Sequence, residues 1–142
     1  VAEHYKWPDT AKKEELIDFY KNTIKEFGLE SIEDSMGYAL SGGQRRKVEI
    51  ARCLASKPKL ILLDEPFAGI DPLAIEDIKN VLKSLSDKGI CILITDHNLR
   101  ETIDICNYSI VIKDGSILDK GEKDYLINSS LIKEEYFGTV FD

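Results

Sequence analysis

The sequence of 142 residues has few cysteines, no long apolar run and a shortage of positive charge. Its three cysteines have no CxxC spacing, which excludes a zinc cluster or disulfide framework and favours reduced thiols in a cytosolic protein. The longest apolar runs, residues 60–63 and 90–94, are far below the roughly 20 residues that a bilayer-spanning helix needs. We expect no signal peptide, and any membrane role to be peripheral.

Basic residues are outnumbered overall but gather in one stretch. There are 19 Lys and Arg against 26 Asp and Glu, which gives a net charge of −7. Such an acidic balance argues against a general nucleic-acid binder. Between residues 45 and 59, one acid, Glu49, faces six basic residues. These six are Arg45, Arg46, Lys47, Arg52, Lys57 and Lys59. The composition, with 43% hydrophobic residues, predicts a folded chain of one domain or a piece of one.

Apolar spacing predicts two helices in the first part of the chain. The first has Leu16, Tyr20, Ile24 and Phe27 on its apolar face, with Asp9 or Thr10 as its cap and Gly28 at its end. We expect its aromatic residues, Phe19, Tyr20 and Phe27, to lie in the core. A second helix starts at residues 41–43 and runs toward Pro58.

The middle of the chain reads as a β-α-β unit, and therefore as an α/β fold with a parallel sheet. Apolar runs at residues 60–63 and 90–95 predict two strands that are buried on both faces. Between them, Asp71 and Pro72 mark the start of a helix. Ligands of such sheets bind at the carboxyl ends of the strands.

The last third predicts a short helix, a β-hairpin and a helical tail. The helix covers residues 99–106, and Asp114-Gly115 is a strong turn signal between strands at residues 108–113 and 116–118. From residue 122 the tail is expected to be helical. Its aromatic residues are available for packing; they are Tyr136, Phe137 and Phe141.

The segment of residues 40–44, Leu40-Ser41-Gly42-Gly43-Gln44, is the strongest local signal for a ligand site. A hydroxyl and two glycines before a basic helix can bind an oxyanion through the Ser41 hydroxyl and unpaired first-turn amides. The simpler interpretation is a serine-capped helix after a loop.

Two adjacent carboxylates, Asp64 and Glu65, stand where the first strand ends. They resemble the Walker B arrangement, in which the first holds the Mg²⁺ shell and the second positions or deprotonates water. An apolar run that ends in Asp is also common without such a role. His97 follows the second strand, and parallel strands would bring it beside both carboxylates. Asp71 has a sufficient structural explanation as a helix cap.

Together these segments resemble, in the same order, the motifs of the nucleotide-binding domain of ATP-binding cassette (ABC) transporters, from about residue 34 to residue 142. The resemblance implies a partial P-loop NTPase fold with a helical subdomain, and ATP and Mg²⁺ as cofactors. It implies that Asp64 holds the metal, Glu65 acts on the attacking water and His97 senses the γ-phosphate. The signature residues and Asp71 would bind at the ATP of a second subunit; they are Leu40, Ser41, Gly42, Gly43 and Gln44.

The resemblance also implies partners. Two ATPase subunits would meet head to tail as a homodimer and drive transmembrane transporter subunits from the cytoplasmic face of the inner membrane, with no nucleic acid involved. Within the family, residues 34–36, 64–72, 95–102 and 135–138 are similar to the ATPase subunits of lipopolysaccharide-export transporters. Branched-chain amino-acid importers share much of this pattern. Two further possibilities stay open: a DNA-repair or ribosome-associated ATPase head, and a non-catalytic interaction fragment.

The sequence contains no GxxxxGK[ST] motif. With Val1 as the first residue, we expect a truncated domain that lacks the Walker A half. Charge-assisted hydrogen bonds to phosphate are worth about 1.5 to 3 kcal/mol each, so the chain alone is expected neither to bind nor to hydrolyse ATP well. We expect three parts: a helical signature subdomain at residues 1–56, part of the catalytic subdomain at 57–121 and a helical tail at 122–142.

Overall fold

The computed structural model describes residues 13–137, in two compact units that comprise residues 1–95 and 96–142 of the chain. The elements of the first unit, in order, are α1 (Lys13–Glu26), η1 (Glu30–Ile32), η2 (Gly37–Ala39), α2 (Gly42–Leu54), β1 (Leu60–Asp64), α3 (Pro72–Asp87) and β2 (Cys91–Thr95). Those of the second are α4 (Leu99–Ile105), β3 (Ser109–Lys113), β4 (Ser116–Gly121), α5 (Lys123–Leu126), α6 (Ser130–Ile132) and the π-helical η3 (Lys133–Phe137). Asp9, Thr10 and Phe141, which carried predictions, lie outside the described residues.

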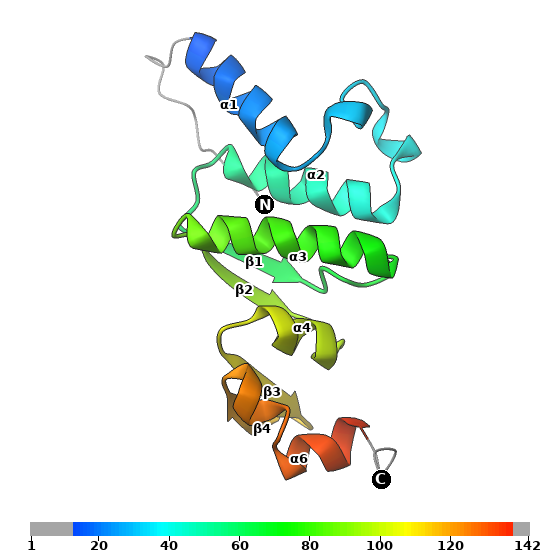
Figure 1. The fold of residues 1–142 in the computed structure, drawn as a ribbon, viewed down its shortest axis with the longest axis vertical. Coiled ribbons are helices and arrows are strands. Elements are labelled where there is room, and N and C mark those ends of the chain that lie inside the picture. The colour runs from blue at the N-terminus through cyan, green and yellow to red at the C-terminus, as the bar shows by residue number, and fades with distance from the viewer. Residues whose placement is uncertain (1–12, 138–142) are drawn as a thin grey trace. The chain divides into compact units, whose positions relative to one another are not determined.

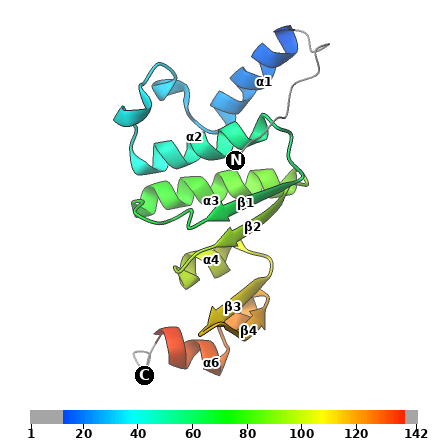
Figure 2. The same cartoon turned by 180° about the vertical axis from the view of Figure 1, so that it is seen from behind.

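The β-α-β prediction is confirmed in the first unit. β1 and β2 pair in parallel, in a register that runs from Leu60 opposite Cys91 to Asp64 opposite Thr95. In Figures 1 and 2, α3 lies along the strands and α2 lies on the far side of α3. Five apolar side chains of α3 are buried, whereas Leu73 in its first turn is exposed; the buried ones are Ile75, Ile78, Val81, Leu82 and Leu85. This helix therefore supplies more buried side chains to the core of the first unit than any other described element.

The expectation that both strands are buried on both faces is wrong. Ile61 and Leu63 are buried, but the opposite face of the sheet exposes Leu60, Leu62 and Leu93 by 50, 67 and 56%. The reason is that α3 covers one face of the strand pair, while side chains alternate between faces along a strand. A fully apolar run can thus occupy a strand with only one covered face.

Helices α2 and α3 run side by side in the same direction. A Cβ atom added at Gly43 would lie 2.5 Å from the Cβ of Ala74, so the two helices touch near their first turns. One turn further along, the Lys47 ammonium lies 3.5 Å from a carboxylate oxygen of Asp77. The first turns of both helices are therefore neighbours at one end of the unit.

The helix predicted from residue 16 to 27 is confirmed as α1, but its core contribution is smaller than expected. Phe27 is buried, as predicted, with 1% of its surface exposed. Tyr20 is not a core residue: it is 46% exposed, and its hydroxyl donates to the Glu33 carboxylate at 2.8 Å. The same bond is the main reason that the pKa of Tyr20 is raised. Phe19 is half-buried.

The second unit confirms the predicted hairpin and extends it. Asp114 and Gly115 have φ angles of 49° and 75°, the left-handed pair that a tight type I′ turn requires. The strand after the turn continues to Gly121 rather than stopping at residue 118, with an irregularity of register beside Val111. Four buried side chains form the core of this unit; they are Ile103, Val111, Leu126 and Ile132.

The helical tail is confirmed as three short pieces, α5, α6 and η3. Tyr136, which was expected to pack, remains 43% exposed. All three cysteines are free, and burial raises the pKa of the Cys106 thiol. Within residues 13–137, none of the helices combines the length and apolar character that crossing a bilayer demands.

Candidate functional site

The signature segment begins α2 as a capped helix. Ser41 is the N-cap, with its hydroxyl oxygen accepting from the Gln44 amide at 3.3 Å, and the Ser41 amide donates to the Gln44 side chain at 2.9 Å. The capped-helix interpretation of this segment is thus correct as a structural fact. It leaves an anion role possible, because the Ser41 hydroxyl hydrogen can still be donated and the amides of Gly42 and Gly43 precede the first i−4 bond of the helix.

The two glycines of the segment have structural roles of their own. Gly43 is buried, and any side chain there would overlap Ala74 of α3. At Gly42, which is exposed, a Cβ would lie 3.4 Å from the carbonyl oxygen of Gly69, in the loop that leads into α3. Close approach of backbones therefore explains Gly43 without a ligand, whereas the site of Gly42 opens toward solvent.

Asp71 caps α3 at the same end of the unit. Its carboxylate accepts from the Ala74 amide at 3.0 Å, with Pro72 in the first helical turn. Since Gly42 and Gly43 approach the loop and first turn of α3, the positive ends of two helix dipoles lie near one another here. This end of the unit favours negative charge.

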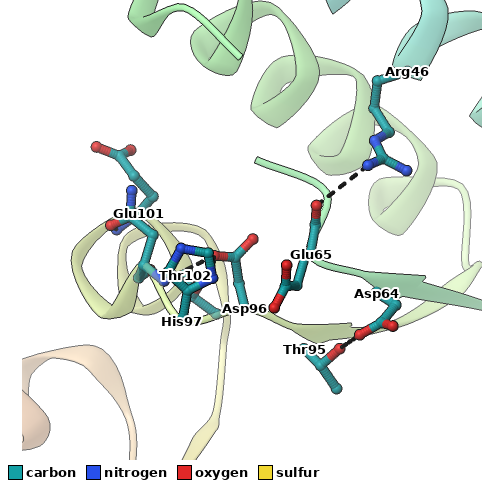
Figure 3. A network of polar contacts seen from close by, with 9 residues as sticks. Arg46, Asp64, Glu65, Thr95, Asp96, His97, Glu101 and Thr102 are labelled. Carbon is teal, nitrogen blue, oxygen red and sulfur yellow. Dashed lines mark hydrogen bonds and ion pairs between the residues drawn. The ribbon is translucent and has the colours of Figure 1, made fainter. Parts of the chain in front are cut away.

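The predicted carboxylates stand at the end of the strand pair, and Thr95 holds that end together. The Thr95 hydroxyl donates to the Asp64 carboxylate at 2.5 Å (Figure 3), and the Thr95 carbonyl accepts from the Glu65 amide at 2.7 Å. Asp64 and Glu65 are both exposed. The Asp64 carboxylate and the Glu65 backbone are therefore fixed to β2 through Thr95, while both residues remain exposed to solvent.

Glu65 has a left-handed backbone, with a φ of 45°, which is uncommon for any residue other than glycine. Its carbonyl oxygen accepts from the Ala68 amide at 3.2 Å, closing a turn, and from the Arg46 guanidinium of α2, also at 3.2 Å (Figure 3). The signature helix is thus tied directly to the residue predicted to act on water.

Sequence reasoning did not identify Arg46 or Thr95 as site residues. Arg46 was one of six basic residues in the stretch, and nothing in the spacing distinguished it. For Glu65 there was a usable signal: the following residue is Pro66, and a residue before proline is disfavoured in the right-handed helical region. That signal excludes one conformation but does not select the left-handed one.

His97 belongs to the second unit, two residues after β2 ends. Its side chain is 73% exposed, and its Nδ1 lies 3.9 Å from the Asp96 carboxylate, whose side chain is almost fully buried. The same Asp96 carboxylate accepts from the Asn98 amide at 2.8 Å, and Asn98 caps α4. The predicted proximity of His97 to Asp64 and Glu65 stays a prediction.

The groups present at the end of unit 1 fit a nucleotide with Mg²⁺ better than a bare metal ion. Among residues 13–137 there is no group of three His, Cys, Asp or Glu side chains that could hold a metal alone. Mg²⁺ is commonly bound by one or two carboxylates together with phosphate and water, and Asp64 supplies one such exposed carboxylate. The capped starts of α2 and α3 offer first-turn backbone amides, a type of group that binds phosphate.

Solved structures share this fold. MJ1267, an ATP-binding cassette of an ABC transporter in its ADP conformation, matches with a TM-score of 0.76 and 33% identity over 94% of this chain and 53% of that one. CbiO1 from Clostridium perfringens, part of the ABC transporter complex cbiONQ, matches with a TM-score of 0.76 and 30% identity over 84% of this chain and 48% of that one. The fold is therefore that of an ATP-binding cassette.

Sequence comparison leads to the same class. The sequence pattern of the ABC transporter family matches residues 2–68. The lipopolysaccharide export ATP-binding proteins LptB of Haemophilus influenzae and Escherichia coli K12 are 48 and 44% identical over 83 and 94% of this chain. The chain belongs to the ABC transporter family of ATP-binding domains. It spans about half the length of these relatives, 49 and 55%.

Proposed function

We propose that this chain is part of the ATP-hydrolysing subunit of an ABC transporter. One observation carries the proposal: the first turns of α2 and α3 are neighbours, and Arg46 ties α2 to Glu65 at the end of β1. In this proposal the link joins a helix start that binds the phosphates of a second copy's ATP to the carboxylates that act on Mg²⁺ and water in the chain's own site. The similarity to ABC transporter ATPases supports the same conclusion.

The roles follow from the chemistry of each group. The Ser41 hydroxyl and the amides of Gly42 and Gly43 bind phosphate oxygens of an ATP carried by a second copy of the subunit. Leu40 and Gln44 belong to the same contact, and the Gln44 side chain holds the Ser41 backbone in place. These residues act together as an anion site only when two subunits meet head to tail.

The carboxylates act on the ATP of their own subunit, which faces the signature segment of the second copy. Asp64 holds Mg²⁺ through water, and the metal neutralises phosphate charge. Glu65 orients or deprotonates the attacking water. His97 senses the γ-phosphate, and Asp71 connects the two sites of the dimer in addition to capping α3.

The transported substrate is lipopolysaccharide in this proposal, because LptB proteins are similar to almost the whole chain. The subunit works as a homodimer beneath transmembrane partners, at the cytoplasmic face of the inner membrane. Residues 1–56 form its helical signature subdomain, residues 57–121 belong to its catalytic subdomain and residues 122–142 form a helical tail. Import of branched-chain amino acids is the second candidate, since those importers share much of the motif pattern.

The first experiment measures ATP hydrolysis by the natural gene product, purified from its own host. Glu65→Gln should lower kcat by about 10²- to 10⁴-fold, the range of a general base, while ATP binding persists. The matched control is Glu30→Gln, because Glu30 is also exposed and lies at the start of η1, away from the strand ends. Equal rates for both variants would contradict the role of Glu65.

A second measurement concerns the chain of 142 residues by itself. It has no GxxxxGK[ST] motif, so we expect no steady phosphate release above background. Sustained release that Glu65→Gln abolishes would overturn this expectation. Salt-dependent binding of DNA or RNA would instead favour a nucleic-acid role.

The substrate is tested by reconstituting the natural gene product with its membrane partners in proteoliposomes. ATP-dependent extraction of lipopolysaccharide supports the proposal. ATP-dependent uptake of leucine or valine without such extraction would favour the importer.

A further inference from the structure

Arg46 contacts two groups with two different nitrogens. Its Nη1 lies 3.0 Å from the Glu49 carboxylate, one turn along the same helix, and its Nη2 donates to the Glu65 carbonyl at 3.2 Å. The Arg46 side chain is only 27% exposed. The Glu49 contact fixes the guanidinium, so that its second nitrogen is aimed at the turn after β1.

The Glu65 peptide groups are held from both sides. Its amide donates to Thr95 of β2, and its carbonyl accepts from Ala68 and from Arg46 of α2. A left-handed backbone at a glutamate persists only where its surroundings determine it, and here those surroundings are three hydrogen bonds. The direction in which a side chain leaves the backbone depends on φ and ψ, so these bonds also set the direction of the Cα–Cβ bond of Glu65 and restrict the positions that its carboxylate can reach.

Arg46 stands within the first two turns of α2, the helix that begins with the candidate phosphate-binding segment. A displacement of this helix start is transmitted to the Glu65 carbonyl through the Arg46 side chain, whose planar guanidinium is held by two contacts. The helix α2 does not need the Arg46 bond for its own stability, because Gly43 and Ile50 of this helix are already buried.

We infer that Arg46 is a positioning residue: it holds the left-handed backbone of Glu65 and thereby couples the start of α2 to the orientation of the Glu65 carboxylate. This inference rests on the proposed function, in which Glu65 acts on water. It assigns Arg46 no contact with ATP.

The experiment uses the natural gene product with Arg46→Ala, Arg46→Lys and Glu49→Gln. The control is Lys83→Ala, which removes one positive charge from an exposed site on α3. Amide hydrogen exchange at Glu65 and Ala68 reports whether the turn is held, and steady-state kinetics report kcat and KM for ATP. Thermal unfolding checks that each variant is folded.

For Arg46→Ala we expect faster exchange at both amides and a loss of kcat of about tenfold or more, the effect of misplacing a catalytic group. KM should stay within about twofold, since uniform binding is unchanged. Arg46→Lys should retain part of the rate because an ammonium can still donate to the carbonyl. Glu49→Gln should give a smaller loss than Arg46→Ala, because a Gln oxygen can still accept.

Exchange at Glu65 and Ala68 equal to that of Lys83→Ala would show that Arg46 does not hold the turn and would overturn the inference. Faster exchange with unchanged kcat, or a raised KM with unchanged kcat, would overturn the positioning role. A wild-type protein without ATPase activity would refute the proposed function and the catalytic part of this inference. In that case the exchange measurement still decides whether Arg46 holds Glu65.

Discussion

The two units differ in how their parts are tied together. In the first, hydrogen bonds join residues as far as 62 positions apart, as from Lys88 to Glu26, and 31 apart, as from Thr95 to Asp64. In the second, the partners of the ion pair between Lys113 and Glu135 are 22 positions apart, and Lys123 and Asp104 are 19 apart. The candidate chemistry of unit 1 therefore depends on tertiary contacts between distant segments, whereas unit 2 forms from neighbouring ones.

Because the chain divides into two compact units, we expect each unit to unfold separately when its own core is disrupted. A defect in the core of unit 2 should leave the strand ends of unit 1 intact. A defect at the contact between α2 and α3 should disturb unit 1 first. Hydrogen exchange resolved by segment tests both statements.

The largest effect is expected from Leu126→Ala in unit 2. Leu126 is fully buried among Ile103, Val111 and Ile132, so its truncation should lower the free energy of unfolding of this unit by about 2 to 5 kcal/mol. Exchange should accelerate in residues 96–137 and stay unchanged in residues 60–95. Ile127→Ala is the control, because Ile127 is 41% exposed. Equal acceleration in both units would contradict their independence.

The next effect is expected from Gly43→Ala in unit 1. The new Cβ would overlap Ala74, so the helices must move apart, at a cost of about 1 to 3 kcal/mol of unfolding free energy. The double variant Gly43→Ala with Ala74→Gly moves the methyl group to the other helix and should recover part of the loss. Urea unfolding measures both. A single variant as stable as the wild type would show that the two helices leave room for a methyl group at this point.

A smaller effect is expected from Asp71→Ala. Loss of the cap on the Ala74 amide should cost about 0.5 to 2 kcal/mol of stability, and Asp71→Asn should restore it. Because Asn keeps the cap but not the charge, its ATPase rate separates capping from the proposed connection between sites. An Asn variant that is wild-type in both stability and rate would remove any role for the Asp71 charge.

The smallest effect is expected in the acid stability of unit 2, through Asp119. The hydrogen bond from Ser129 lowers the pKa of Asp119 below its ordinary value of 3.8. The folded unit thus binds this proton less readily than the unfolded chain, so its contribution to stability is present above pH 3.8 and is lost as the pH falls through the folded pKa. Unfolding followed from about pH 5 to about pH 2 should show a weaker acid dependence in Ser129→Ala. An unchanged profile would contradict this assignment.

Local patterns predicted most of the elements. The turn at Asp114-Gly115 needs left-handed backbone at both positions, which this residue pair supplies by itself. The apolar periodicity of α3 and the capping residues Ser41 and Asp71 likewise act within a few positions of the chain. Such features depend on neighbours in sequence, so the amino-acid sequence alone is enough to predict them.

The features that were missed depend on distant partners. Tyr20 has the spacing of a core residue, but its hydroxyl binds Glu33 instead. The exposure of Leu62 depends on which face α3 covers, and the role of Arg46 depends on where a turn 19 residues later is placed. Motif spacing led to Asp64 and Glu65, whereas the group that fixes the Glu65 backbone is found only in three dimensions.

The bonds of Thr95 also determine how the strand pair responds to mechanical tension. It is the last residue of the first unit, and both its hydroxyl and its carbonyl are engaged with the end of β1. Because the parallel strands end at the same edge, tension between residues 66 and 96 pulls that edge open one bond at a time instead of shearing the whole strand pair. The first bonds to bear the load are those from Thr95 to the Asp64 carboxylate and the Glu65 amide, so such a pull acts first on the segment that carries the two carboxylates.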